Sequence, residues 1–378
     1  MIQIERLVLR EIALSLREQF RTSSGTTHDR RILLVEAFGA GGESGWGECV
    51  AEESPAYSYE TVDTAWLAIP GWVAPVVLGR AFDGPGEVAP ALDRAFRGHP
   101  MARAAVEMAA WDLAARQDGV SLSRLLGCTR DRVETGISLG IQGSPGALAE
   151  RARAAVAEGY RRVKVKVGPG EDLEFAAAAR EAVGEGFPLS LDANAAYTPD
   201  DLEVLRRLDA LRPAMIEQPL DPDDLMGHAR LQGALAAPIC LDESITSAAR
   251  ASDALDMGAA RVINIKPGRV GGHTASRAIH DLAQGRGVPV WCGGMLESGV
   301  GRAHNVALAS LPGFTLPGDL SPSRRYWVRD IVDPEWEMTG GALRVPRDRP
   351  GIGVEVDRDL IESITVRRTE VGEARRAG

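Results

Sequence analysis

The sequence predicts an α/β protein in which a parallel barrel follows a separate α+β domain. From about residue 133 onward, eight short β-branched segments alternate with amphipathic helical segments. Polar residues end these strands around the whole set, which favours a closed barrel over an open sheet. Before residue 128 the strands come first and the helices follow, a pattern that indicates a separate α+β domain.

The N-terminal region divides into a hairpin and two helices. Residues 1–16 and 31–38 alternate as strands do, and the turn-rich segment 20–30 (FRTSSGTTHDR) is expected to form the long tip between them. Apolar residues at helical spacing predict helices around residues 60–78 and 101–118. We therefore expect an N-terminal domain over residues 1–127 and a barrel over 128–321. Residues 322–378 start no new βα unit and are expected to pack back on the N-terminal domain.

The barrel strands are predicted from eight apolar segments, most of which end in polar residues. In chain order these segments are GISLGI, RVKVKV, PLSLDAN, AMIEQPL, PICLDES, RVINIKPG, PVWCGG and FTLPGDL. Five charged residues follow the middle strands at near-constant spacing: Lys166, Asp192, Glu217, Asp242 and Lys266. Because parallel-barrel enzymes gather their strand ends at one mouth, these side chains are predicted to converge in an active site.

Three carboxylates in this series predict a metal site. Asp192, Glu217 and Asp242 follow consecutive strands, so without a partner they would repel one another. A set of oxygen ligands suits Mg²⁺ or Mn²⁺, and no His or Cys has the spacing of a zinc site. The alternative is that each acid only caps the next helix, which explains one Asp more readily than three in phase.

Three lysines predict proton-transfer chemistry. Lys164 and Lys166 lie two apart on one strand and share a face, so the pKa of at least one of them is expected to be lowered, which would free an amine to act as a base. Lys266 follows a strand on the opposite side of the barrel. Two amines on opposite faces of one carbon suit removal of a proton next to a carboxylate, through an enediolate.

These motifs resemble those of a known family. KVK, DAN, IEQPL, LDES and NIKPGRVGG are similar to the enolase superfamily, in the muconate-lactonizing-enzyme subgroup with a lysine on each side of the substrate. FRTSSGT, GWGEC, CGGMLESGVGR and SLPGFTLPGDLS resemble the family of o-succinylbenzoate synthases and N-acylamino acid (N-succinylamino acid) racemases. The resemblance spans nearly the whole chain. It implies a modified (β/α)7β TIM-like barrel, capped by an α+β domain built from the N-terminal region and the C-terminal tail.

The resemblance also implies roles for individual residues. Lys166 and Lys266 would be the acid/base pair with Lys164 as an auxiliary cation, and one Mg²⁺ or Mn²⁺ would bind the three carboxylates. Asn194 and Glu243 would lie near the metal. Substrate contacts would come from Ser138, Gly294, Met295, Phe20, Thr22 and Ser24. Relatives often carry an aromatic residue where this chain has Ser24, so the pocket is expected to differ there.

Several reactions share the enediolate step. A mandelate-racemase type of site would need a His after the seventh strand, where this chain has CGGMLESG. Dipeptide epimerases carry DxD after the eighth strand, where this chain has Asp319 alone. o-Succinylbenzoate synthesis, a dehydration in menaquinone biosynthesis, and N-succinylamino acid racemisation use the same residues, so the sequence leaves both open. Muconate cycloisomerisation also stays open, as does a catalytically inactive metal-binding barrel.

Composition narrows the class of partner. The formal net charge of −10 disfavours nucleic acid, because binding it needs a clustered basic surface. The start of the sequence interleaves charges where a signal peptide needs an apolar run, and no stretch is apolar enough to span a membrane, so a cytoplasmic location is expected. The expected partner is a small-molecule carboxylate, and the resemblance implies a homo-oligomer.

Overall fold

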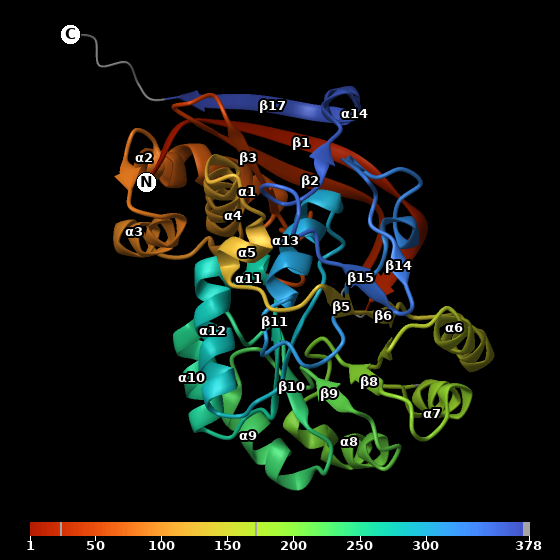
Figure 1. Ribbon diagram of the computed structural model, residues 1–378. Helices are drawn as coiled ribbons and strands as arrows, with labels where there is room; N and C mark the ends of the chain where they lie inside the picture. The colour runs from red at the N-terminus through yellow and green to blue at the C-terminus, as the bar shows by residue number, and fades with distance from the viewer. Residues whose placement is uncertain (23–24, 171, 373–378) are drawn as a thin grey trace.

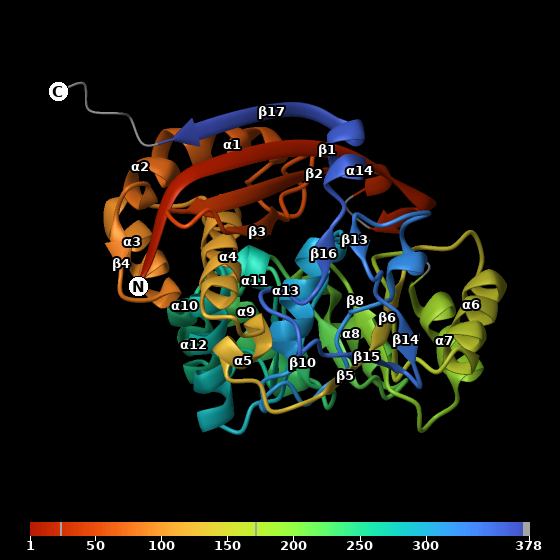
Figure 2. The same ribbon diagram turned by 45° about the horizontal axis from the view of Figure 1, so that its top comes forward.

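The computed structural model describes residues 1–22, 25–170 and 172–372 and contains a capping domain over a barrel (Figures 1 and 2). The capping sheet is antiparallel, with the order β17 (Thr365–Gly372), β1 (Ile2–Thr22), β2 (Gly25–Gly39) and β3 (Ser44–Cys49), and β4 (Ala81–Phe82) also pairs with β1. Strand β17 therefore joins the C-terminal segment to the N-terminal sheet, and Figure 1 shows it running along β1.

The hairpin is longer than the sequence predicts. Residues 20–30 were expected to form a turn-rich tip, but β1 and β2 stay paired from Phe20 opposite Thr27 to Thr22 opposite Gly25. The threonines of this segment suit paired strands, so the tip extends as a two-stranded ribbon beyond the sheet.

Helices of the capping domain pack against the sheet and against the barrel. They are α1 (Val62–Ala68), a π-helical turn (Ile69–Val73), α2 (Ala74–Val77), α3 (Val88–Ala95), α4 (Pro100–Gln117) and α5 (Leu122–Leu126). A Cβ atom on Gly45 or Gly47 would lie 2.2 Å from the Leu113 nitrogen or 2.0 Å from the Ala105 oxygen, both in α4. The glycines of the GWGEC motif thus let α4 approach β3 closely.

Seven short parallel strands form the barrel in sequential order. They are β6 (Gly136–Leu139), β7 (Arg162–Lys166), β8 (Leu189–Asp192), β9 (Met215–Glu217), β10 (Ile239–Leu241), β11 (Val262–Ile265) and β12 (Val290–Cys292). The outer helices are α6 (Pro145–Ala157), α7 (Asp172–Val183), α8 (Leu202–Asp209), α9 (Leu225–Ala234), α10 (Ala248–Asp256), α11 (Pro267–Val270), α12 (His273–Gly285) and α13 (Gly299–Ala309).

The predicted eighth strand is irregular. Residues 314–320 (FTLPGDL) make only isolated parallel bridges, from Phe314 to Val290 in β12 and from Gly318 to Thr135 beside β6. Pro317 has no N–H to donate to a ladder, which accounts for the interruption. The segment still spans the gap between the first and last strands, since Gly136 N donates to Gly318 O at 2.6 Å and Asp319 N donates to Cys292 O at 3.0 Å.

The remaining elements belong mostly to the C-terminal segment. They are β5 (Arg132–Glu134), β13 (Val332–Asp333), β14 (Met338–Thr339), β15 (Ala342–Arg344), β16 (Glu355–Val356) and α14 (Arg358–Ile364), with 3₁₀ turns at Pro85–Glu87, Pro199–Asp201 and Ser323–Arg325. In the described part of the chain, no helix has both the length and the apolar character needed to cross a bilayer.

Two buried carboxylates of the capping domain fix it to the barrel. Glu48 in β3 accepts hydrogen bonds from the Ser298 and Gly301 backbone nitrogens at the start of α13 (3.1 and 3.0 Å). Glu107 in α4 accepts from the His273 and Thr274 nitrogens at the start of α12 (2.8 and 2.9 Å). A carboxylate at a helix N-terminus satisfies otherwise unpaired N–H groups, so these contacts set the position of the cap over the barrel mouth.

Candidate active site

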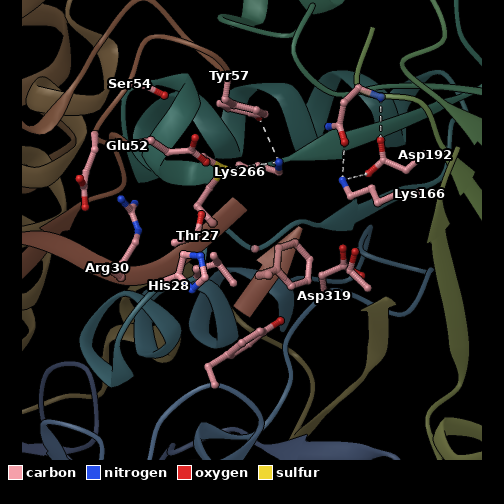
Figure 3. Close-up of a pocket in the computed structure, with 18 of the residues that line it drawn as sticks. Thr27, His28, Arg30, Glu52, Ser54, Tyr57, Lys166, Asp192, Lys266 and Asp319 are labelled. Atoms are coloured by element: carbon pink, nitrogen blue, oxygen red, sulfur yellow. Dashed lines mark hydrogen bonds and ion pairs between the residues drawn. The ribbon is translucent and has the colours of Figure 1, made fainter. Parts of the chain in front are cut away.

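A cavity of about 500 Å³ lies between the carboxyl ends of the barrel strands and the capping domain (Figure 3). The barrel contributes Ser138, Lys164, Lys166, Asp192, Asn194, Lys266, Gly294, Met295, Leu296 and Asp319 to its lining. The capping domain contributes Phe20, Thr27, His28, Asp29, Arg30, Glu52, Glu53, Ser54 and Tyr57, and Tyr326 completes it.

All of the lysines of this protein line the cavity. The 378-residue sequence contains three lysines, Lys164, Lys166 and Lys266, and every other basic residue is Arg or His. Each of the three is buried or nearly so, with a side-chain exposure of 5 to 8%. Side-chain amines are therefore confined to this cavity, as expected of groups that are present for their chemistry rather than for surface charge.

Lys166 is held by the neighbouring strand of the barrel. The ladder places Lys166 opposite Asp192 and Asp192 opposite Glu217, so the spacing seen in the sequence does bring these side chains together. Lys166 Nζ donates to Asp192 Oδ2 at 2.7 Å and to Asn194 Oδ1 at 2.5 Å. Asn194 also donates to Glu243 Oε1 at 2.9 Å, so the two residues predicted near the metal form one chain of contacts with Lys166.

Lys266 lies on the other side of the cavity, just after β11. Its Nζ donates to Asp242 Oδ2 at 2.8 Å and to the Tyr57 hydroxyl at 3.0 Å, and it lies 3.5 Å from Met295 Sδ. Arg269 pairs with the other oxygen of Asp242. Figure 3 shows Tyr57 and Lys266 linked across the cavity from the Lys166–Asp192 pair.

Lys164 sits among three carboxylates. Its Nζ lies 2.9 Å from Asp192, 3.0 Å from Glu217 and 2.9 Å from Asp319. Burial alone would lower the pKa of Lys164, but attraction to Asp192, Asp319 and Glu217 outweighs it and raises that pKa above its usual value. Lys164 is therefore not a lysine of lowered pKa, because three acids surround it, a number that the sequence did not reveal.

The acids of the cavity interact with one another through space. Burial, followed by repulsion from Asp192 and Asp242, raises the pKa of Glu217 to about 7; burial with repulsion from the same two acids raises that of Glu243 to about 8. Burial also opposes ionisation of both Asp192 and Asp242. Attraction to Lys164 and Lys166 outweighs it for Asp192, and attraction to Lys266 and Arg269 outweighs it for Asp242, so both pKa values are lowered. Four carboxylates thus compete for positive charge at the strand ends.

The three carboxylates do not converge on one point. Among the described residues, no group of three or more His, Cys, Asp or Glu side chains is arranged so that it could hold one metal ion. Lys164 lies between Asp192 and Glu217. Asp242 lies two residues beyond Cys240, the residue that pairs with Glu217, and so further toward the mouth. The donor chemistry nevertheless suits a hard divalent cation: the oxygens are buried, they repel one another, and Glu243 Oε2 has no hydrogen-bond partner among the described residues.

The predicted substrate residues are partly placed by the structure. Ser138, Gly294, Met295 and Phe20 line the cavity. The buried Ser138 Oγ has no hydrogen-bond partner in the described part of the chain, so it is available to a ligand. A Cβ at Gly294 would lie 2.7 Å from the Asp319 carbonyl oxygen, which explains the glycine. Only the backbone of Thr22, at the end of β1, is described, and Ser24 lies outside the described residues.

Sequence reasoning missed Tyr57, Arg269 and the role of Asp319. Tyr57 comes from an irregular loop of the capping domain and belongs to no periodic pattern. Arg269 follows Lys266 by three residues, and the short helix α11 brings both side chains to Asp242; the NIKPGR sequence could have suggested this. Asp319 was noted only as a lone acid, whereas it accepts from Arg162 at 3.0 Å and contacts Lys164.

Comparison with known proteins identifies the family. Residues 147–360 match the enolase C-terminal domain-like family, and residues 5–127 match the mandelate racemase/muconate lactonizing enzyme N-terminal domain. The chain belongs to the enolase superfamily. Enzymes of this superfamily generally depend on a divalent metal, in keeping with the cluster of carboxylates.

Similar members of the superfamily cover nearly the whole chain. An o-succinylbenzoate synthase of Geobacillus stearothermophilus is 48% identical over 364 residues, 96% of each chain. An N-succinylamino acid racemase of Thermus thermophilus is 48% identical over 365 residues, 97% of this chain and 98% of the relative. The crystal structure of a superfamily member from Listeria innocua superposes with a TM-score of 0.94 at 36% identity, covering 98% of this chain and 100% of that one.

Proposed function

We propose that this enzyme removes the proton α to a carboxylate and uses the resulting enediolate for N-succinylamino acid racemisation, for o-succinylbenzoate synthesis, or for both. The observation that carries the proposal is the placement of Lys166 and Lys266 on opposite sides of one cavity that contains every amine side chain of the protein. Full-length relatives with 48% identity bear both of these activities in their names.

In racemisation, each lysine serves one face of the α-carbon. One amine takes the α-proton and leaves the electron pair in an enediolate; the ammonium opposite then donates its own proton to the other face. The product is the other enantiomer of the N-succinylamino acid, with one proton removed and one returned. Positioned amines of this kind contribute about 10²–10⁴-fold in rate.

In o-succinylbenzoate synthesis, a single face suffices. Lys166 takes the α-proton of the hydroxycyclohexadiene carboxylate and returns it to the departing hydroxyl on the same face. The C–O bond breaks, water leaves and the ring becomes aromatic, while Lys266 remains an ammonium over the ring. The same residues thus support a two-base and a one-base reaction.

We assign the divalent cation, Mg²⁺ or Mn²⁺, to Asp192, Glu217 and Asp242. These three acids are buried and offer only oxygen ligands. Repulsion from Asp192 and Asp242 contributes to the raised pKa of Glu217, so the three carboxylates lie close enough to repel one another. When bound, such a cation would supply the positive charge that stabilises a developing dianion. Asn194 accepts from Lys166, and its backbone nitrogen donates to Asp192 Oδ1 at 3.1 Å, while its side chain donates to Glu243; Asn194 would therefore orient the lysine relative to these acids.

The surroundings of Asp319 favour an N-acyl substrate over a dipeptide. A dipeptide carries an ammonium group that needs an available carboxylate. Both oxygens of Asp319 are engaged, one by Arg162 at 3.0 Å and one by Lys164 at 2.9 Å. Asp319, the acid at the place where a dipeptide epimerase binds the ammonium group of its substrate, is therefore already paired with two cations of the protein.

The test is a direct assay of the purified enzyme with Mg²⁺. We expect turnover of N-succinyl amino acids, followed by polarimetry, and of the cyclohexadiene precursor, followed by absorbance. Comparable efficiency on both would establish a bifunctional enzyme. An enzyme that binds Mg²⁺ but acts on neither substrate would exclude the proposed function and favour an inactive barrel.

A further inference from the structure

We propose that Tyr57, a residue of the capping domain, is a positioning residue for Lys266, so that this base is held by both domains whereas Lys166 is held by the barrel. The proposal rests on the proposed function, because it assigns to Tyr57 a part in one of the two proton transfers. It arises from the hydrogen bonds of the Tyr57 hydroxyl and from the way its loop is anchored.

The Tyr57 hydroxyl is saturated by three charged neighbours. It donates to Asp242 Oδ1 at 3.0 Å, and it accepts from Lys266 Nζ at 3.0 Å and from Arg269 at 3.2 Å. A tyrosine hydroxyl has one proton to donate and can accept from the cations only through its lone pairs. The direction of all three bonds is therefore fixed, and the lone pair that faces Lys266 has a defined orientation.

Lys266 needs such a partner because its amine ends a flexible four-carbon chain. The ring of Tyr57 also lies against it, with Nζ 4.6 Å from the ring centroid, within the range of a cation–π contact. Its other oxygen partner, Asp242, is shared with Arg269 and is also an acid assigned to the cation. Tyr57 is thus the uncharged oxygen that orients Lys266.

The loop that carries Tyr57 is fixed at both ends. Arg30 in β2 donates to the carbonyl oxygens of Val50 and Ala51, at 2.7 and 2.9 Å, where the loop leaves β3. Glu60, where the loop ends, accepts from the Met101 and Ala102 nitrogens in the first turn of α4, at 2.7 and 3.0 Å. Residues 53–56 between these anchors are exposed, whereas Tyr57 turns into the cavity. The anchors therefore hold the tyrosine over the barrel mouth.

Lys166 is held in a different way. Its hydrogen bonds among the described residues go to Asp192 and Asn194, both of the barrel. Removing the Tyr57 hydroxyl should therefore disturb proton transfer at one face of the substrate and spare the other. A general loss of structure would affect both faces.

The first test uses the fact that the chain has three lysines. Protein labelled with carbon-13 at lysine Cε should give three signals, which are assigned by replacing each lysine with Arg in turn. In the full-length Mg²⁺ enzyme, Tyr57→Phe should shift the Lys266 signal and leave the Lys166 signal in place. If both signals move alike, or neither moves, the proposal is wrong.

The second test measures exchange of the substrate α-proton with heavy water at each face. The Lys166→Ala background reports the face served by Lys266, and the Lys266→Ala background reports the other. Adding Tyr57→Phe should slow exchange roughly tenfold in the first background, mainly through kcat, and less than twofold in the second. Equal loss in both would identify Tyr57 as a structural residue only.

Two controls distinguish loss of the Tyr57–Lys266 contact from general damage to the protein and from loss of the cation. Tyr197→Phe removes a buried hydroxyl that bonds Asp172 outside the cavity lining, and it should leave both faces and all three signals unchanged. Mg²⁺ affinity measured by calorimetry should stay within threefold in Tyr57→Phe; a large loss of affinity without a shift of the Lys266 signal would overturn the proposal. A wild-type enzyme that exchanges neither enantiomer would instead refute the proposed function, while the lysine signals would still test the contact.

Discussion

The two sides of the cavity are built differently. On the Lys166 side, the lysine, Asp192 and Glu217 lie opposite one another on adjacent strands, so the barrel ladder alone brings them together. On the Lys266 side, the lysine follows its strand and shares Asp242 with Arg269, and a tyrosine from the capping domain completes the set. The strand register of the barrel alone positions the Lys166 side, whereas residues of both domains form the Lys266 side.

This difference between the two sides suggests how one barrel can support both a one-base and a two-base reaction. The base common to both proposed reactions, Lys166, is the one fixed by the rigid sheet. The base that racemisation needs in addition depends on the position of the cap. Changes in the capping loops can therefore alter the second base without disturbing the first.

The largest predicted effect comes from removing the second base. Lys266→Ala should lower racemisation of N-succinyl amino acids by about 10³-fold, because one face of the carbon loses its acid and base. Polarimetry measures the rate, and calorimetry should show that Mg²⁺ still binds. Arg261→Ala, an exposed cation at the opposite end of the same strand, is the matched control. Racemisation within tenfold of the wild type would contradict the two-base assignment.

A smaller effect is expected on the Lys166 side from Asp319→Asn. The substitution keeps the shape of the side chain but removes the charge that Arg162 and Lys164 share. The Lys164 side chain should move away from its position in the wild type. We expect this movement to lower kcat/KM by roughly 100-fold for both reactions. A buried Arg162 without its partner should also cost about 3 kcal/mol of unfolding free energy, measured by chemical denaturation. Asp200→Asn, at an exposed site, should do neither. Full activity in Asp319→Asn would show that Lys164 does not depend on the charge of Asp319.

The smallest predicted effect concerns the capping side alone. Phe20, near the end of β1, lines the cavity from the capping domain. Phe20→Ala should raise KM by roughly tenfold, to a different extent for different acyl groups or side chains, and leave kcat nearly unchanged. Steady-state kinetics with a set of N-succinyl amino acids measures the change. A uniform fall in kcat would place Phe20 in the chemistry rather than in selectivity.

The Lys166 side could be predicted from the sequence, and the Lys266 side only in part. The regular spacing of the βα units predicted the positions of Lys166, Asp192, Glu217 and Lys266. Residues that end successive parallel strands lie close together in space, so a regular spacing in sequence predicts a cluster in the structure. Tyr57 could not be found in this way. It lies in a loop of another domain, and its contact with Lys266 depends on how the two domains pack.

Similar limits explain the errors in the fold. The segment with Pro317 has the composition of a strand, but the missing N–H limits its pairing to isolated bridges. The segment 20–30 has the composition of a turn, but β1 and β2 continue to pair along it. The raised pKa of Lys164 could not be predicted from its neighbours in sequence, because Asp319, far away in the chain, adds a third carboxylate.

The central claim is that Lys166 and Lys266 act on opposite faces of one carbon, and exchange of the α-proton tests it most directly. Lys166→Ala and Lys266→Ala are each incubated in heavy water with the separate enantiomers of an N-succinyl amino acid, and exchange is followed by proton NMR. We expect each variant to exchange one enantiomer only, and the two variants to choose opposite enantiomers. Exchange of the same enantiomer by both variants would contradict the claim.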